Sequence, residues 1–157
     1  MANNYTQFSE VIEGLTPAAC EWIETILCLD SYDGEEREKI AQMLQLEGET
    51  SDLDDWPGFQ WKIEGQGTGA DCKHSLWLYA EEVCDFYQVE LFVHSLICAF
   101  MPDYIFTLTA AETCSRLRCG EFGGGWMVIT KDGAVGSNTW SDAEAYVKTL
   151  KKGARLA

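Results

Sequence analysis

The chain has 157 residues, of which 26 are acidic and 11 basic, giving a net charge of −15. That charge repels phosphate backbones and membrane surfaces, so it argues against direct nucleic-acid or membrane binding and favours basic protein partners. The longest apolar stretch, residues 91–101, is too short to cross a bilayer, and the N-terminus lacks a secretory signal. Seven cysteines at irregular spacing indicate reduced thiols, so we expect a cytoplasmic protein.

The charge is concentrated near the N-terminus. Residues 1–57 hold fourteen acids against two bases, a net of −12, whereas residues 58–157 carry a net of −3. We therefore expect a single domain, 1–157, that joins an acidic helical part, 1–57, to a sheet-containing part, 58–157.

Helical signals dominate the first part. The apolar residues at helical spacing that predict a first helix are Tyr5, Phe8, Val11, Ile12 and Leu15. Thr16 and the proline after it predict the start of a second helix over residues 17–29. Asp33 followed by Glu36 is typical of a capping box for a third helix. Residues 47–55 have no period and carry five acids, which predicts a loop.

After Gly58 the apolar period changes to the alternation of a β-strand. The elements predicted there are strands over 59–64 and 76–81, a helix over 86–100, strands over 104–113 and 126–130, a turn at 131–133, and a helix over 142–151 that Ser141 and Glu144 cap. Tight turns between strands favour antiparallel pairing. The sequence therefore predicts an α+β fold with a four-stranded, mainly antiparallel sheet in ββαββα order, covered by helices.

Two segments resemble a known group of proteins. They are residues 104–115, which end in Thr-Cys-Ser, and residues 120–130, which begin Gly-Glu-Phe-Gly-Gly-Gly. This pattern resembles small uncharacterised proteins of phages and other mobile elements, which pair such a strand with such a loop and a second strand. The resemblance covers about residues 86–130. It implies a small α+β fold, a mobile-element origin and hence a host-cell cytoplasm, but no activity or catalytic residue.

The glycines do not predict a nucleotide site. Gly123–Gly125 precede a predicted strand, whereas a phosphate-binding loop follows a strand and opens a helix. The preferred interpretation is a turn, or a bulge beside closely packed backbone.

Thiols and histidines give candidate metal ligands. The four that could suit tetrahedral zinc are Cys72, His74, Cys114 and Cys119. Neither pair has the Cys-x-x-Cys spacing of a strong zinc motif, so inert thiols and no cofactor are preferred. Glu90, His94 and Cys98 share one helix face, and a rim ion pair with a packed cysteine is preferred to a site there.

The alternative function is an enzyme or metal-dependent module. Cys114 has Arg116 and Arg118 nearby, and such cations favour the thiolate form of a cysteine. If the chain is an enzyme, Cys114 is the candidate nucleophile and Glu121 the candidate acid or base, beside the Gly123–Gly125 loop. No hydrolase motif supports this alternative.

The leading hypothesis is based on the acidic clusters. Carboxylates that end at an aromatic side chain combine electrostatic steering with an apolar anchor, and carboxylates on rigid elements imitate nucleic-acid phosphates. The residues expected to bind the partner are Glu35, Glu36, Glu38, Asp52, Asp54, Asp55 and Trp56. We therefore expect a non-enzymatic protein that binds and inhibits a host protein with a basic surface. The expected target is a nucleic-acid-handling enzyme or a defence enzyme of the kind that anti-CRISPR and anti-restriction proteins inhibit. A homo-oligomer formed through strand edges is a further alternative.

Overall fold

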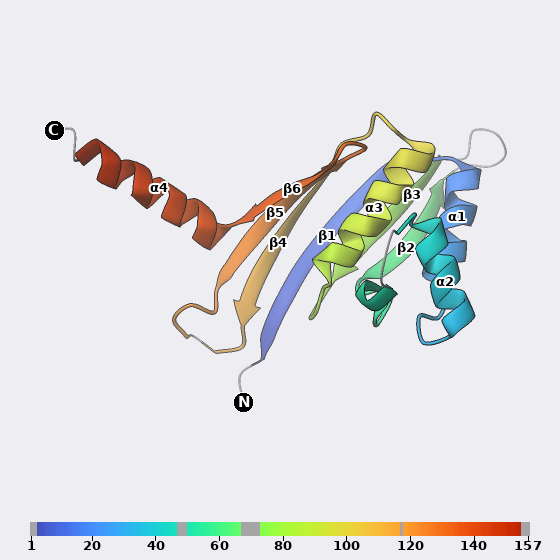
Figure 1. Cartoon of the computed structure of the whole chain (residues 1–157), viewed down its shortest axis with the longest axis horizontal. Coiled ribbons are helices and arrows are strands. Elements are labelled where there is room, and N and C mark those ends of the chain that lie inside the picture. The colour runs from blue at the N-terminus through green and yellow to red at the C-terminus, as the bar shows by residue number, and fades with distance from the viewer. Residues whose placement is uncertain (1–2, 47–49, 67–72, 117, 155–157) are drawn as a thin grey trace.

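The computed structural model describes residues 3–46, 50–66, 73–116 and 118–154 (Figure 1). The strands are β1 (Asn4–Leu15), β2 (Gln60–Gln66), β3 (Lys73–Ala80), β4 (Phe106–Cys114), β5 (Gly123–Thr130) and β6 (Gly133–Asn138). The helices are α1 (Pro17–Leu27), α2 (Gly34–Met43), the short 3-10 helix η1 (Thr50–Leu53), α3 (Phe86–Phe100) and α4 (Thr139–Ala154).

All six strands form one antiparallel sheet in the order β2-β3-β1-β4-β5-β6. Strand β1 lies at the centre, and Phe8 is where its pairing changes: residues 4–8 pair with β4, and residues 8–15 pair with β3. Beyond Phe8, Glu10 bridges β1 and β4, since its Oε1 accepts hydrogen bonds from the backbone N–H (3.0 Å) and Oγ1 (3.2 Å) of Thr109. The backbone ladder between the two central strands, β1 and β4, therefore ends at Phe8, and a side-chain contact replaces it beyond that point.

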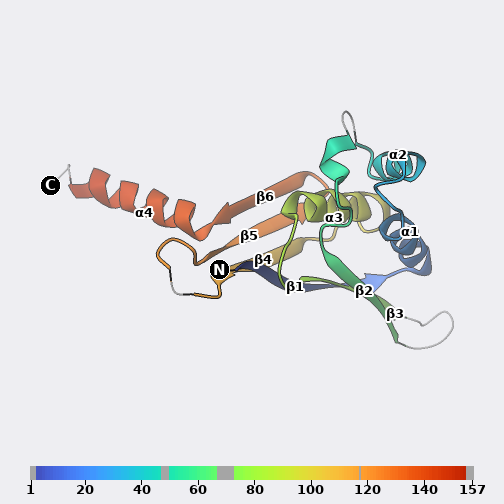
Figure 2. The same cartoon turned by 90° about the horizontal axis from the view of Figure 1, so that it is seen from below.

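The core lies between one face of this sheet and α3, with α1 and α2 beside α3 (Figure 2). Fully buried side chains come from both layers, among them Ile12 of β1, Leu78 of β3, and Phe92 and Leu96 of α3. Trp22 of α1 stacks on Phe92 with 5.8 Å between ring centroids, which fastens α1 to α3. Among the described residues, no helix is long and apolar enough to cross a membrane.

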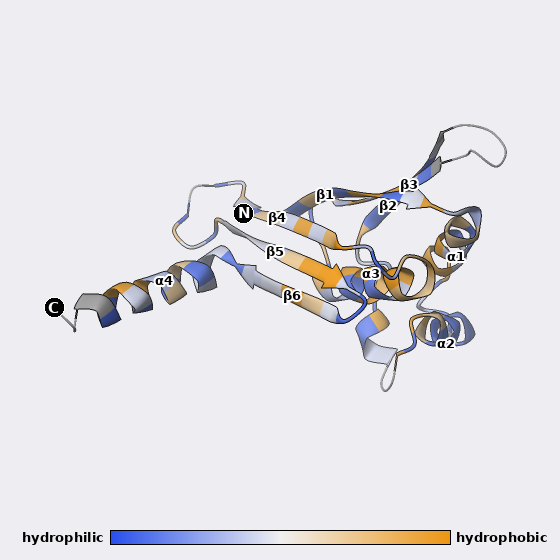
Figure 3. Ribbon diagram, turned by 90° about the horizontal axis from the view of Figure 1, so that it is seen from above, coloured by the Kyte–Doolittle hydropathy of each residue, from blue (hydrophilic) through white to orange (hydrophobic). Residues whose placement is uncertain are grey.

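Helix α4 is arranged differently from the other helices. It continues from β6 and projects away from the sheet and the helical layer (Figures 1 and 3). Its described side chains, residues 139–152, are all exposed. None of these described side chains therefore belongs to the core.

The prediction of a first helix over residues 5–15 is wrong, because this segment is the central strand. Phe8 and Ile12 are four residues apart, a spacing that fits both a helix and one face of a strand. A bulge between Glu13 and Leu15 then shifts the register by one, so Leu15 also reaches the core side. Gly14 permits this bulge by adopting a φ of +78°. The buried residues Phe8, Ile12 and Leu15 therefore have the spacing of a helix, although they lie on one face of a bulged strand.

The predicted four-stranded sheet is also wrong, although the α+β class is confirmed. One of the two extra strands is β1. The other is β6, whose sequence Gly-Ala-Val-Gly-Ser-Asn has little β-propensity. The turn predicted at 131–133 exists, but the chain returns from it beside β5. A Cβ on Gly136 would lie 2.7 Å from the Trp126 carbonyl oxygen, so this close pairing requires a residue without a side chain.

Several predicted helix boundaries agree with the structure. The Thr16 hydroxyl accepts a hydrogen bond from the Ala19 N–H at the start of α1, and the Asp33 carboxylate accepts from two backbone N–H groups at the start of α2. The last helix begins earlier than predicted. Asn138, not Ser141, caps it, since Asn138 Oδ1 accepts from the Ser141 N–H at 2.9 Å.

Candidate protein-binding surface

Two acidic segments that the sequence separates lie side by side in the structure. Helix α2 carries Glu35, Glu36 and Glu38, and η1 with the residues after it carries Asp52, Asp54 and Asp55. We call these six residues, together with Tyr32, the acidic surface.

Arg37 joins the two segments of the acidic surface. Its Nε and Nη2 donate hydrogen bonds to the Thr50 carbonyl oxygen at 3.0 and 2.7 Å, and Nη2 also pairs with the Asp54 carboxylate. The Arg37 side chain is only 23% exposed, and its guanidinium group bonds within the chain, where it holds α2 against η1. One arginine neutralises only one of the six carboxylates around it, so the acidic surface keeps a net negative charge.

Gln88 of α3 fixes the backbone from which the aspartates project. Its side chain is 1% exposed; Nε2 donates to the carbonyl oxygens of Asp52 (3.0 Å) and Asp54 (2.8 Å), and Oε1 accepts from the Gly58 N–H (2.7 Å). Because the carbonyl groups point inward to Gln88, the carboxylates of Asp52 and Asp54 remain outside, and both residues are exposed.

The six predicted carboxylates fall into two groups. Glu36 accepts a hydrogen bond from the Asp30 N–H, Asp54 pairs with Arg37, and Asp55 accepts from the Tyr32 hydroxyl. The carboxylates of the other three, which are Glu35, Glu38 and Asp52, are exposed and take no hydrogen bond or ion pair from the described part of the chain. These three are available to a partner without a rearrangement.

Trp56 does not provide the exposed anchor that the sequence suggested. Its side chain is 6% exposed and packs edge-on against Phe59 and Phe92, and its Nε1 donates to the Ile26 carbonyl oxygen at 3.0 Å. The indole therefore belongs to the core, and a partner cannot reach it without unfolding this layer.

The exposed aromatic beside the acids is Tyr32, which the sequence reasoning missed. Its ring is 78% exposed, and its hydroxyl donates to Asp55. This hydrogen bond and the Asp55 charge raise the pKa of Tyr32 above its ordinary value, so the phenol stays protonated. The available signal was an aromatic in a turn between two acids, Asp30 and Asp33.

The residues of the alternative function also come together. The Cys114 thiol donates to Glu121 Oε2 at 2.9 Å, and Arg118 contacts the other carboxylate oxygen at 3.5 Å. Neither histidine of the chain bonds Cys114: His94 contacts the Lys131 carbonyl oxygen, and His74 lies on β3 opposite Leu15. The thiol thus faces a carboxylate, not the imidazole base that an activated cysteine uses.

The pKa of Glu121 is lowered, chiefly because the Cys114 thiol donates to it and secondarily because Arg118 is near. A lowered carboxyl pKa marks a favourable interaction that is present above the unfolded-state pKa and is lost as the pH falls through the folded-state value. We expect the Glu121 pKa to rise toward its ordinary value in Cys114→Ala, measured by a carbon NMR titration of the carboxyl group. Cys119→Ala, which removes a neighbouring exposed thiol, should leave it unchanged. An unaltered titration in Cys114→Ala would mean that the hydrogen bond does not form in solution.

The expectation that Gly123–Gly125 precede a strand is wrong, because they pair with β4 as the first residues of β5. A Cβ on Gly124 would lie 2.5 Å from the Ala110 carbonyl oxygen of β4. The three glycines lie within β5 itself, and no helix follows them to bind a phosphate. The structure agrees with closely packed backbone.

The candidate metal ligands do not assemble in the described part of the chain, where no group of three His, Cys, Asp or Glu side chains could hold an ion. Cys72 lies outside the described residues. The expectation that Cys98 packs inside is wrong, because its thiol is exposed. It approaches His94 Nε2 at 3.6 Å, and both contact the Lys131 carbonyl oxygen, which ties α3 to the β5–β6 turn. Burial raises the pKa of another thiol, Cys84, to about 12.

No family of known proteins, no curated protein and no solved structure matches this chain in sequence or fold comparisons. The functional argument therefore rests on the geometry and charge of the acidic surface.

Proposed function

We propose that the chain is a non-enzymatic interaction protein whose acidic surface binds a basic surface of a host protein and thereby blocks it. The observation that carries the proposal is the convergence of two separate acidic segments around the exposed ring of Tyr32. Three carboxylates there take no partner from the described residues, and the neighbouring Arg37 pairs with Asp54 and Thr50 of the same chain.

Charge of this kind acts first on the encounter between two proteins. A surface with a net negative charge accelerates association with a positively charged partner, and the effect falls as salt screens it over about 10 Å at 0.1 M. Tyr32 adds the second element of an interface, a rigid aromatic that contributes buried area at low cost in conformational entropy.

Mimicry of nucleic acid is the specific form of inhibition that we propose. The backbone segments that carry these carboxylates are held by Arg37 and Gln88, so the spacing of α2 and η1 does not depend on the partner. Lysines and arginines that bind phosphates also bind carboxylates, and such a target would exchange its nucleic acid for this protein. The mobile-element origin suggested by the resemblance fits a host enzyme as the target.

The test is a charge reversal limited to the free carboxylates. The triple variant Glu35→Lys, Glu38→Lys, Asp52→Lys changes the net charge by six and disrupts no hydrogen bond of these side chains within the described residues. We expect it to lose capture of a basic protein from host lysate that the unaltered chain binds at low salt. Far-UV circular dichroism should be the same for both.

The matched control is Asp103→Lys, Asp132→Lys, Glu144→Lys, which makes the same charge change at exposed positions elsewhere. If the control variant also loses capture, net charge and not this surface is responsible. Addition of duplex nucleic acid should displace the captured protein. Capture that persists in the triple variant and in high salt would contradict the proposal.

A further inference from the structure

Helix α4 presents an apolar face that is largely exposed in the described part of the chain, where only Trp140 at its base comes close to β5, beside Gly123. Successive residues turn by about 100° around a helix, so five apolar side chains gather on one third of its circumference. They are Trp140, Ala143, Tyr146, Val147 and Leu150. The exposed fractions of Trp140, Tyr146 and Leu150 are 54%, 66% and 56%. An exposed face of five neighbouring apolar side chains is typical of an interaction site.

Contacts at its base fasten the first turn of α4 to the end of the sheet and fix the direction in which the helix projects (Figure 1). The Asp142 carboxylate accepts hydrogen bonds from Ser137 Oγ at 2.6 Å and from Trp126 Nε1 at 3.3 Å. Asn138 caps the helix immediately after β6, so no loop intervenes that could let it fold back. While these contacts persist, no helix or strand of the described chain can bury the apolar face, so another molecule is needed to cover it.

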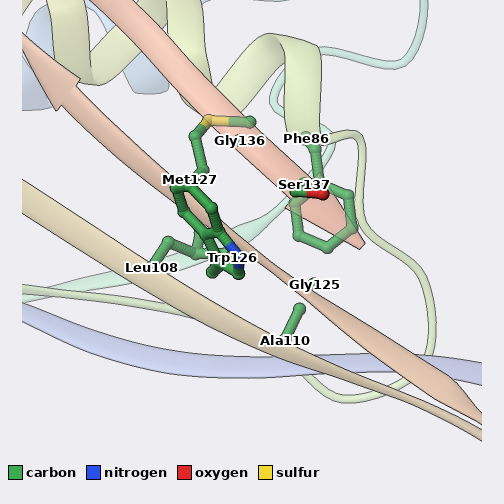
Figure 4. Close-up of a pocket in the computed structure, with 8 residues that line it drawn as sticks. All are labelled: Phe86, Leu108, Ala110, Gly125, Trp126, Met127, Gly136 and Ser137. Carbon is green, nitrogen blue, oxygen red and sulfur yellow. The ribbon is translucent and has the colours of Figure 1, made fainter. Parts of the chain in front are cut away.

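The same end of the sheet carries a complementary pocket (Figure 4). Its volume is ≈ 170 Å³, and it lies between the first residue of α3 and strands β4 to β6. The residues that line it are Phe86, Leu108, Ala110, Gly125, Trp126, Met127, Gly136 and Ser137. Leu108, Ala110 and Met127 stand on the face of the sheet that α3 covers elsewhere. This apolar surface lies where a further helix would complete the layer.

The charges around the two surfaces are opposite. The last two turns of α4 carry Lys148, Lys151 and Lys152. The loop that enters α3 beside the pocket is acidic, with Glu81, Glu82 and Asp85 all exposed. Between these acids Val83 is 80% exposed, so the same loop also presents an apolar side chain. A basic helix with an apolar face thus matches an apolar pocket with an acidic rim, and both belong to one chain.

We propose that α4 is an exchanged arm: in a twofold dimer, the α4 helix of each copy lies in the pocket beside α3 of the other. A second copy is the occupant because the chain itself supplies both complementary surfaces. A reciprocal exchange closes after two copies, so it buries both helices and leaves no unused site. The dimer is independent of the acidic surface on α2 and η1, so each proposal can fail without the other.

The first experiment measures the mass of the full-length chain by sedimentation equilibrium at about 50 µM, above the micromolar Kd of a weak interface. We expect twice the chain mass of 17.6 kDa. Val147→Asp with Leu150→Asp, on the apolar face, should give a monomer. Ala145→Asp with Thr149→Asp adds the same charge to the opposite face of the same turns and should remain a dimer. A monomeric unaltered chain would overturn the proposal.

The second experiment separates exchange from other modes of pairing. Ala110→Lys places bulk and positive charge in the pocket opposite the lysines of α4, and Ala110→Leu fills it without charge. Both should weaken the dimer by at least tenfold in Kd, with unchanged circular dichroism. An arm variant with an intact pocket, mixed with a pocket variant with an intact arm, should form a one-to-one heterodimer, because one arm and one pocket still fit.

Three outcomes would contradict exchange. If the pocket variants dimerise as tightly as the unaltered chain, the two α4 helices pair with each other. If the arm variant stays dimeric, the edges of β6 pair instead. If only Glu35→Lys with Glu38→Lys breaks the dimer, α4 binds the acidic surface of the second copy.

Discussion

Replacement of Trp56 by alanine is expected to lower the free energy of unfolding by about 3–5 kcal/mol, the range for a large aromatic removed from a core. The indole is 6% exposed, and its ring centroid lies 6.1 Å from that of Phe59 and 6.4 Å from that of Phe92. Its removal also leaves the Ile26 carbonyl oxygen without its donor. For a chain of this length the melting temperature should fall by roughly 10 °C, which calorimetry measures directly.

Two further substitutions serve as comparisons, one for the hydrogen bond of the indole and one for an exposed aromatic. Trp56→Phe keeps most of the apolar area but loses the hydrogen bond, so it should cost about 1–3 kcal/mol. Tyr32→Ala removes an aromatic that is 78% exposed and should change stability by no more than about 0.5 kcal/mol. The proposed function predicts the opposite order for partner capture: Tyr32→Ala weakens it, and Trp56→Phe leaves it intact. A stable Trp56→Ala variant with reduced capture would show that the indole is available to a partner after all.

Gln88→Leu is expected to destabilise the chain by about 3 kcal/mol, although leucine fits nearly the same volume. The buried amide serves three backbone groups: it accepts from the Gly58 N–H and donates to the carbonyl oxygens of Asp52 and Asp54. Leucine satisfies none of them, and a buried polar group left unpaired costs more than an ordinary hydrogen bond contributes. Denaturant unfolding gives the change in free energy.

Hydrogen exchange locates the same effect along the chain. Amides of residues 50–58 should exchange faster in Gln88→Leu, because the hydrogen bonds from Gln88 of α3 to Asp52, Asp54 and Gly58 are lost. Amides of the central strand β1 should change less. Gln42→Leu on the exposed side of α2 is the matched control and should leave both stability and exchange unaltered. Equal protection of residues 50–58 in the two variants would mean that Gln88 does not fix the aspartates of the acidic surface.

Parts of the fold are specified by local sequence. Thr16 with its proline and Asp33 specify the starts of α1 and α2, because a capping side chain acts on N–H groups two or three residues away. The alternation after Gly58 and the apolar stripe of residues 86–100 likewise specify β2 and α3. Each of these signals is complete within a few residues.

Other parts depended on neighbours that are distant in the chain. Residues 4–15 form a strand because β3 and β4 pair with them from both sides, whereas their spacing alone fitted a helix equally well. Strand β6 forms despite its glycines because β5 passes close enough that a Cβ at Gly136 could not be accommodated. Local propensity is weaker than such pairing, so sequence reasoning predicted the class of the fold but not the number of strands.

The candidate site divides in the same way. Composition alone establishes that the chain is strongly acidic and that its carboxylates are concentrated before residue 57, since charge needs no folding to be counted. Packing, in contrast, determines which carboxylates are free, places Trp56 inside and Tyr32 outside, and joins α2 and η1 into one surface. Burial is set by what packs above a residue, and for Trp56 those neighbours are Phe59, just before β2, and Phe92, which comes much later in the chain on α3.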